Sequence, residues 1–173
     1  MKMYRAGYYI LLFAVAALLQ IFFFNSLSLW SCFAPMVYMA FVLMLPLNAP
    51  SIAVLLSGLA MGMVMDFTMG TAGLNTIATL AVAYMRRPVL NLVLGAEVVR
   101  DGGIPSVQRM GSRPFWQYLI IMEVLHGVLF FGFEAFTTSY LWFQFLRLTV
   151  STLASILFVW LLMLLFTPKH SSR

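Results

Sequence analysis

Residues 54–84 read VLLSGLAMGMVMDFTMGTAGLNTIATLAVAY, which is two apolar runs separated by a glycine-containing turn. With their flanking residues these runs predict two consecutive membrane-crossing helices, since a spanning helix takes roughly 20 residues. Gly58 and Gly62 lie four residues apart, so they share a helix face and allow another helix to approach closely. Asp66 continues the same row. We therefore expect a close-packed face that ends in a carboxylate, with its neighbour either in this chain or in a partner.

The composition of the whole chain agrees with a membrane protein. Of its 173 residues 63% are apolar and 9% are charged, with a mean hydropathy of +0.98, whereas soluble domains are about 45–50% apolar and about 25% charged. This excludes a soluble enzyme, a disordered chain and a nucleic-acid-binding domain. We expect an all-α integral membrane protein whose single domain covers residues 1–173. Its six transmembrane helices are expected at residues 8–27, 30–47, 51–67, 71–85, 115–137 and 142–166.

Basic residues predict the orientation, because loops rich in Lys and Arg stay on the cytoplasmic side of a membrane. With six spans and a cytoplasmic N-terminus, nine of the ten basic residues lie inside, namely Lys2, Arg5, Arg86, Arg87, Arg100, Arg109, Arg113, Lys169 and Arg173. Arg147 is the exception, and five or seven spans would place one basic end outside. We therefore expect both termini in the cytoplasm.

The longest expected connection is a polar, basic cytoplasmic loop at residues 86–113. Within it, four apolar residues recur at helical spacing: Leu90, Val93, Leu94 and Val98. This short amphipathic stretch predicts a helix on the inner membrane surface beside acidic lipid. The alternative is a docking element for a cytoplasmic partner.

Five ionisable residues fall inside the expected spans: Asp66, Glu123, His126, Glu134 and Arg147. Charges at membrane depth are costly, so each is a candidate functional residue. Glu134 and Arg147 lie at equal depth, about 9–10 Å from the turn between the last two spans, and we expect them to pair. Asp66 is near the same outer end and could share the arginine. The pair is either a clamp between helices or part of a periplasm-facing contact site for another membrane protein.

Glu123 and His126 lie three residues apart and therefore share a helix face. His126 is about 16 Å from the inner end of the fifth span, near the middle of the membrane. Such a couple serves either as a proton relay or as a hydrogen-bonded structural pair that faces the bundle. No array of partner charges is present on the other spans, which favours the structural interpretation. The relay interpretation would make the chain a proton-coupled carrier.

No motif points to catalysis or to a cofactor. A Walker loop, a nucleophile–base arrangement and metalloprotease spacing are all missing. Met61, Met65 and Met69 repeat at four-residue intervals, and thioethers suit Cu(I). A Met- and His-rich segment that would collect copper is missing too, so adaptable packing is the expected role of these methionines. We expect a protein that is not an enzyme and that uses no metal or cofactor.

The stretch at residues 54–84 resembles the rod shape-determining MreD family. The shared pattern is a glycine-bearing apolar span that ends in Asp, a short glycine turn, and a span that starts near Gly-Leu. In this chain the pattern consists of Gly58, Gly62, Asp66, Gly70, Gly73 and Leu74. The length, the six-span layout, the basic inner loop and the short tails are also similar to that family. The resemblance is detailed over this stretch and architectural elsewhere.

The resemblance implies a non-enzymatic subunit of the bacterial cell-elongation machinery, a multi-pass protein of the inner membrane that scaffolds or regulates peptidoglycan synthesis and maintains rod shape. Its partners would be the bitopic protein MreC and, directly or indirectly, the MreB filament, the RodA glycosyltransferase and a penicillin-binding transpeptidase.

The family's fold is similar to that of the S component of energy-coupling-factor transporters. This similarity implies the alternative, a six-span bundle that binds a vitamin-like solute. S components typically meet the transport engine through an Ala-xxx-Ala step on the first span, whereas in this chain Ala14 is followed at that spacing by Leu18. The MreD-like function is therefore our main expectation, and it includes no small-molecule ligand.

Overall fold

The computed structural model describes residues 2–27, 33–136 and 141–166, which form helices and connections and no strand. The helices are α1 (Lys2–Leu18), the π-helix η1 (Leu19–Phe24), α2 (Asn25–Leu27), α3 (Met39–Leu43), α4 (Ser51–Met69), α5 (Leu74–Leu94), α6 (Ala96–Asp101), α7 (Val107–Met110), α8 (Ser112–Ala135) and α9 (Leu141–Phe166). In this part of the chain, five helical stretches are long and apolar enough to cross a membrane: Gly7–Phe24, α4, α5, α8 and α9. The expectation of an all-helical, multi-pass protein is confirmed at this level.

Five of the six expected spans coincide with these helices. The helices α4, α8 and α9 begin and end close to the predicted bounds, and α1, η1 and α2 together cover the first span. The fourth span differs, because α5 continues through Pro88 to Leu94 rather than ending at residue 85. The two arginines that suggested a loop fit on this helix, since Arg86 is buried in the protein and Arg87 is exposed.

The second expected span, residues 30–47, is wrong as a spanning helix. Residues 33–38 are not helical, and α3 covers only Met39–Leu43. Proline disfavours the α conformation in the residue before it and cannot donate a helical backbone hydrogen bond. Pro35 and Pro46 lie on either side of α3 and confine the helix to this short stretch.

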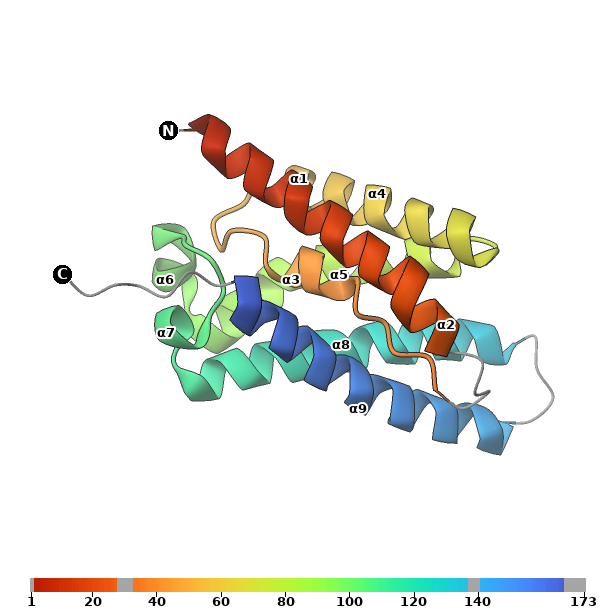
Figure 1. Ribbon diagram of the computed structural model, residues 1–173. Helices are drawn as coiled ribbons and strands as arrows, with labels where there is room; N and C mark the ends of the chain where they lie inside the picture. Colours follow the sequence, from red (N-terminus) through yellow and green to blue (C-terminus); the bar gives the residue numbers. More distant parts are fainter. Residues whose placement is uncertain (1, 28–32, 137–140, 167–173) are drawn as a thin grey trace.

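The apolar character of this region has a different cause. Residues 33–50, which we call the central segment, pass through the middle of the bundle, where residues 36–44 are at most 4% exposed. Figure 1 shows α3 surrounded by the long helices, and the chain then reaches the end of the bundle at which α4 begins. Irregular backbone at membrane depth is tolerated only where protein surrounds it and satisfies its polar groups. The segment is therefore apolar because protein encloses it.

The long helices run roughly along one direction in Figure 1. The helices α4 and α5 form an antiparallel hairpin, α5 packs on α8, and α8 packs on α9. The short helices α6 and α7 lie at the end of the bundle where α1 begins and α9 ends. At this end the Tyr8 hydroxyl donates a hydrogen bond of 2.7 Å to the carbonyl of Phe166. We call it the α6–α7 end, and the α4–α5 turn lies at the opposite end.

The connection expected at residues 86–113 is folded onto the protein. Its first part is the end of α5, where Leu90 is fully buried, and Gly95, with φ of +84°, separates α5 from α6. The central segment reaches this connection, because the backbone N–H of Leu47 donates to the carbonyl of Gly103 at 2.8 Å. The predicted amphipathic stretch is therefore divided between α5 and α6 and packs partly on the core, rather than forming one helix on the membrane surface.

The glycine face of α4 packs against the chain's own α5. A Cβ atom at Gly58 would lie 3.0 Å from the Cβ of Ala83, and a Cβ atom at Gly62 would lie 2.6 Å from the Cα of Thr76. The second distance is too short for any side chain, so the backbones touch because Gly62 has none. The question that the sequence left open is thereby answered: the neighbour of this face belongs to the same chain.

The turn between α4 and α5 depends on two further glycines of the MreD-like pattern. Gly70 ends α4 with φ of +66°, and Gly73 precedes α5 with φ of +90°. Both values lie in the left-handed region, which glycine adopts at little cost. The glycine turn thus reverses the chain directly and aligns the end of α4 with the start of α5.

Candidate functional site

Asp66, in the last turn of α4, caps the start of α5. Its Oδ1 accepts hydrogen bonds from the backbone N–H of Asn75 at 3.0 Å and from the hydroxyl of Thr71 at 2.6 Å. Its Oδ2 accepts from the backbone N–H and the hydroxyl of Thr76 at 2.9 and 2.5 Å. A carboxylate in this place satisfies N–H groups that have no partner within the helix and interacts favourably with the helix dipole. The carboxylate of the MreD-like pattern therefore holds the two helices of the hairpin together.

Asn75 extends this cap into the interior of the bundle. Its Nδ2 donates to Asp66 Oδ1 at 3.2 Å and to the hydroxyl of Thr71 at 2.7 Å, so its Oδ1 is available as an acceptor. The Tyr38 hydroxyl of the central segment donates to that oxygen at 2.9 Å. The same hydroxyl lies 2.9 Å from Nε2 of His126 on α8. Because the single hydroxyl proton of Tyr38 points to Asn75, the histidine must donate through Nε2.

We refer to Tyr38, Asn75, Thr79 and His126 as the polar core. All four side chains are at most 1% exposed, and the Thr79 hydroxyl lies 3.4 Å from that of Tyr38. In this arrangement Tyr38 accepts from the histidine N–H and gives its own proton to Asn75, so the contact acts as a hydrogen bond rather than as a step of proton transfer. The Asn75 amide does not titrate, so the cluster offers no continuous proton path toward Asp66. Fully satisfied polar clusters of this kind also fix a unique packing arrangement.

Glu123 lies one turn before His126 on α8 and is 1% exposed. Within the described residues no hydrogen bond joins the two side chains, and Oε1 of Glu123 has no hydrogen-bond partner. The hydrogen-bonded pair considered as the structural alternative is therefore absent, because His126 bonds to Tyr38 instead. A buried polar atom without a partner is unusual and costly. Glu123 thus remains a candidate for a functional role.

The expected Glu134–Arg147 ion pair is confirmed. Oε2 of Glu134 accepts from an Nη atom of Arg147 at 2.7 Å, and each side chain is 22% exposed. The guanidinium also lies 5.4 Å from the centre of the Phe131 ring, within the range of a cation–π interaction. Asp66 does not share the arginine in the described structure, since its oxygens bond to residues at the start of α5. The pair links α8 to α9 and leaves part of both charges accessible.

Gln20 holds the central segment through hydrogen bonds, a role that the sequence did not predict. It lies in η1 and is 2% exposed. Its Oε1 accepts from the backbone N–H of Val37 at 2.7 Å, and its Nε2 donates to the carbonyl of Pro35 at 3.1 Å. The amide side chain therefore replaces the hydrogen bonds that a regular helix would have supplied to this part of the central segment. A glutamine within an otherwise apolar span was the available signal.

Two serines of α9 also hold the central segment, and the sequence did not predict this role. The backbone N–H of Ala34 donates to Oγ of Ser151 at 3.0 Å, and that of Met36 donates to Oγ of Ser155 at 2.7 Å. The serines are four residues apart, so both face the central segment from the same side of α9. Their spacing within an apolar helix was a weak signal, because small residues at that interval usually indicate only close packing.

Arg86 has a different role from the one expected for a cytoplasmic loop residue. It is 2% exposed and donates to the carbonyls of Leu45 and Pro46 and, through Nε at 3.0 Å, to the hydroxyl of Tyr118. The Tyr118 hydroxyl in turn donates to the carbonyl of Leu43 at 3.1 Å. Arg86 and Tyr118 thus anchor the second half of the central segment to α5 and α8.

The described residues contain no cluster of three His, Cys, Asp or Glu side chains that could hold a metal ion. The chemistry that the site offers is hydrogen bonding and charge pairing. The long helices surround the irregular central segment and bind its backbone through side-chain hydrogen bonds. No family model, curated protein or solved structure matches this chain.

Proposed function

We propose that this protein is a non-enzymatic membrane subunit of the bacterial cell-elongation machinery, which scaffolds or regulates peptidoglycan synthesis and rod shape. The observation that carries the proposal is the hairpin of α4 and α5. Gly62 allows backbone contact, Gly70 and Gly73 make the turn, and Asp66 caps the next helix. The MreD-like pattern thus corresponds to one cooperating structural unit, which supports the view that the resemblance is more than a coincidence of composition.

On this proposal the protein acts by binding, and the Glu134–Arg147 pair is the polar feature that a partner would use. Each side chain is 22% exposed, and exposed apolar side chains such as Phe133 and Leu146 are adjacent to the pair in sequence. A partly exposed ion pair among apolar side chains offers a membrane partner polar contacts that lipid tails do not provide. The proposed direct partner is an MreC-like bitopic protein. An MreB-like filament, a RodA glycosyltransferase and a penicillin-binding transpeptidase would be reached directly or through it.

Site-specific photo-crosslinking in the cells that express the protein tests this assignment. A crosslinker at Leu146, which is 45% exposed and next to Arg147, is expected to form an adduct with an MreC-like protein. A matched crosslinker at Leu92 of α5, which is 81% exposed, serves as the control for non-specific contact. Equal adducts at both positions, or an adduct at neither, would count against the proposed surface.

The polar core gives the alternative, an S component for a vitamin-like solute, one specific observation in its favour. Polar side chains from the central segment, α5 and α8 converge in the interior, and Glu123, three residues before His126 on α8, provides an unpartnered oxygen. A solute-binding subunit needs such convergent polar groups. Thermal stabilisation of the purified protein by one member of a panel of vitamins would favour this alternative, and the MreD-like function predicts no stabilisation by any of them.

A proton-coupled carrier is the third possible function, and it would use the buried side chains of Glu123 and His126. That function requires the buried histidine to take part in transport rather than in packing alone. Replacement of His126 by Ala would then abolish uptake of a solute while leaving assembly intact. The MreD-like function instead predicts that this replacement weakens the fold and has no separate effect on uptake.

A further inference from the structure

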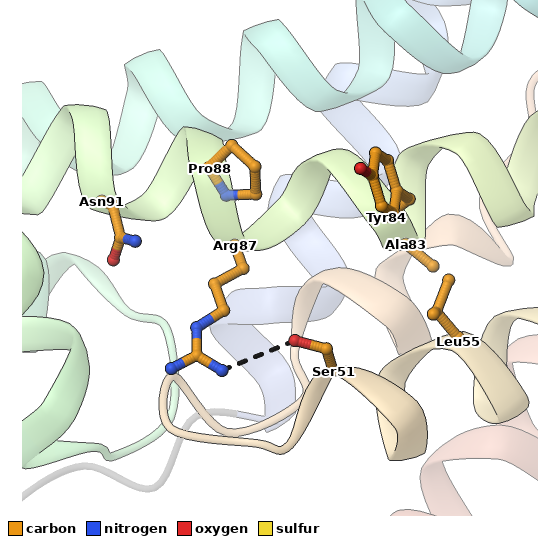
Figure 2. Close-up of a pocket in the computed structure, with 7 residues that line it drawn as sticks. All are labelled: Ser51, Leu55, Ala83, Tyr84, Arg87, Pro88 and Asn91. Atoms are coloured by element: carbon orange, nitrogen blue, oxygen red, sulfur yellow. Dashed lines mark hydrogen bonds between the residues drawn. The ribbon is translucent and has the colours of Figure 1, made fainter.

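An open pocket of about 340 Å³ lies between the first turns of α4 and the second half of α5. Figure 2 shows Arg87 extending from α5 toward Ser51, with Tyr84 and Leu55 on one side of it and Asn91 on the other. The lining is mixed: guanidinium, hydroxyl and amide groups face the pocket together with an aromatic ring and an aliphatic side chain. Such a combination suits a ligand that has one charged and one apolar part.

Arg87 is the only charged residue of the pocket lining. Its one hydrogen bond in the described structure is a long one, 3.5 Å from an Nη atom to Oγ of Ser51, and no carboxylate lies within ion-pair distance. The neighbouring Arg86 differs, since it is buried and bonded to two carbonyls and a tyrosine hydroxyl. Arg87 therefore presents most of its five N–H donors to a ligand, in a planar arrangement that matches two oxygens of a phosphate group.

The position of the pocket along the helices corresponds to the boundary of a bilayer. Ser51 is the first residue of α4 and lies about 27 Å along that helix from Met69 at 1.5 Å per residue, close to the roughly 30 Å thickness of the apolar core of a bilayer, and Arg87 lies beside Ser51. Both are toward the α6–α7 end of the bundle. Tyr84, which is 63% exposed, lies three residues closer to the middle of α5. Arginine and tyrosine in this order are typical of the headgroup level, where an aromatic ring contacts the glycerol region and a cation contacts phosphate.

We propose that this pocket binds the phosphate group of an anionic membrane phospholipid. Arg87 makes a bidentate contact with the phosphate oxygens, the Ser51 hydroxyl and the Asn91 amide donate further hydrogen bonds, and the glycerol and upper acyl region lie against Tyr84 and Leu55. A free phosphate ion offers the same oxygens but no apolar part, so the tyrosine and leucine favour the lipid. The proposal is independent of the function proposed above.

Native mass spectrometry of the full-length protein tests the pocket, with phosphatidylglycerol and phosphatidylcholine added to the detergent-purified chain. Phosphatidylglycerol is expected to bind more tightly than phosphatidylcholine, and Arg87→Gln is expected to weaken its binding about tenfold, as loss of one charge-assisted contact implies. Arg87→Lys keeps the charge but not the planar fork, so it should give an intermediate loss. Arg100→Gln on α6 removes an exposed charge outside the pocket lining and is the matched control.

Four results would overturn the proposal. Equal weakening by Arg87→Gln and Arg100→Gln would show general attraction to basic residues, and unchanged binding in Arg87→Gln would exclude the pocket. Displacement of phosphatidylglycerol by millimolar inorganic phosphate would show that the site recognises the free ion. Ser51→Ala retains Arg87 and removes only the hydroxyl that faces it, so a smaller loss of phosphatidylglycerol binding in this variant supports the geometry even where Arg87→Gln folds poorly. No loss in Ser51→Ala would count against it.

Discussion

The hydroxyl of Tyr38 lies 2.9 Å from Nε2 of His126 and joins the irregular central segment to α8. The same hydroxyl donates to Asn75 of α5, so one buried oxygen connects three parts of the bundle. Polar groups in the interior stabilise a fold when they are satisfied and destabilise it when they lose a partner. The bonds between the central segment and its surroundings are therefore the first to test by substitution.

Tyr38→Phe is expected to lower the free energy of unfolding by about 1–3 kcal/mol, because it leaves buried groups of Asn75 and His126 without a partner. The measurement is the unfolding transition of the purified protein in detergent. Tyr84→Phe removes a hydroxyl from an exposed side chain and should leave the transition unchanged. A Tyr38→Phe protein as stable as the wild type would show that the polar core does not hold the central segment.

Ser155→Ala should also destabilise the protein by about 1–3 kcal/mol, because the buried backbone N–H of Met36 loses its acceptor. Thr149→Ala is the control on the same helix, since that exposed hydroxyl bonds only to the carbonyl of Phe145 within its own helix. Comparison of the two melting curves isolates the effect of the central segment. Equal stabilities would contradict the role given to Ser155.

Gly62→Ala is expected to separate α4 from α5 and to destabilise the protein by about 1–3 kcal/mol, the usual range for overpacking. The added Cβ would lie 2.6 Å from the Cα of Thr76, a backbone atom that cannot move without shifting the helix. Gly132→Ala provides the matched control, because nothing lies within 4 Å of the Cβ position there. Similar melting temperatures for the two variants would refute the close packing of the hairpin.

Asp66→Asn should destabilise the start of α5 by about 1–2 kcal/mol, since the amide cannot accept at both of its terminal atoms. Hydrogen exchange is the direct measurement: the backbone amides of Asn75 and Thr76 should exchange faster in the variant. Glu134→Gln, which alters a carboxylate on α8 instead, should leave those two amides protected. Unchanged protection in Asp66→Asn would mean that the carboxylate does not cap the helix.

The Glu134–Arg147 pair makes a prediction about coupling. Glu134→Arg and Arg147→Glu should each destabilise the protein, and the double replacement should recover stability by a coupling energy on the order of 1 kcal/mol. The partial exposure of both side chains and the need to reposition them keep the expected value moderate. Strictly additive effects of the two single changes would show that the charges do not interact.

Local features of the fold were predictable from the sequence because they depend on residues near one another in the chain. Gly62, Asp66 and Gly73 lie within one hairpin, and their spacing already indicated close packing, a terminal carboxylate and a reversal. The Glu134–Arg147 pair was predictable for a similar reason, since the two residues lie at nearly equal sequence distances from residue 140, near which the sequence predicted a reversal. In each case helix geometry alone relates sequence separation to position in space.

The central segment was not predictable in the same way. An apolar run enclosed by protein has the same composition as one exposed to lipid, so residues 30–47 resembled a spanning helix. The groups that satisfy its backbone are distant in sequence: Ser151 bonds to Ala34, and Gln20 bonds to Val37. Arg86 likewise looked like an orientation signal, and only the fold shows that it contacts buried carbonyls.

The proposed function is tested most directly by the shape of the cells that lose this protein. The measurement is the distribution of cell width and length during controlled depletion in the cells that carry the gene, with re-expression of the wild-type chain as the control. A subunit of the elongation machinery predicts that the cells widen, become round and stop elongating before they lyse, and that re-expression restores rods. Depleted cells that keep normal width and length while they grow would contradict the proposal.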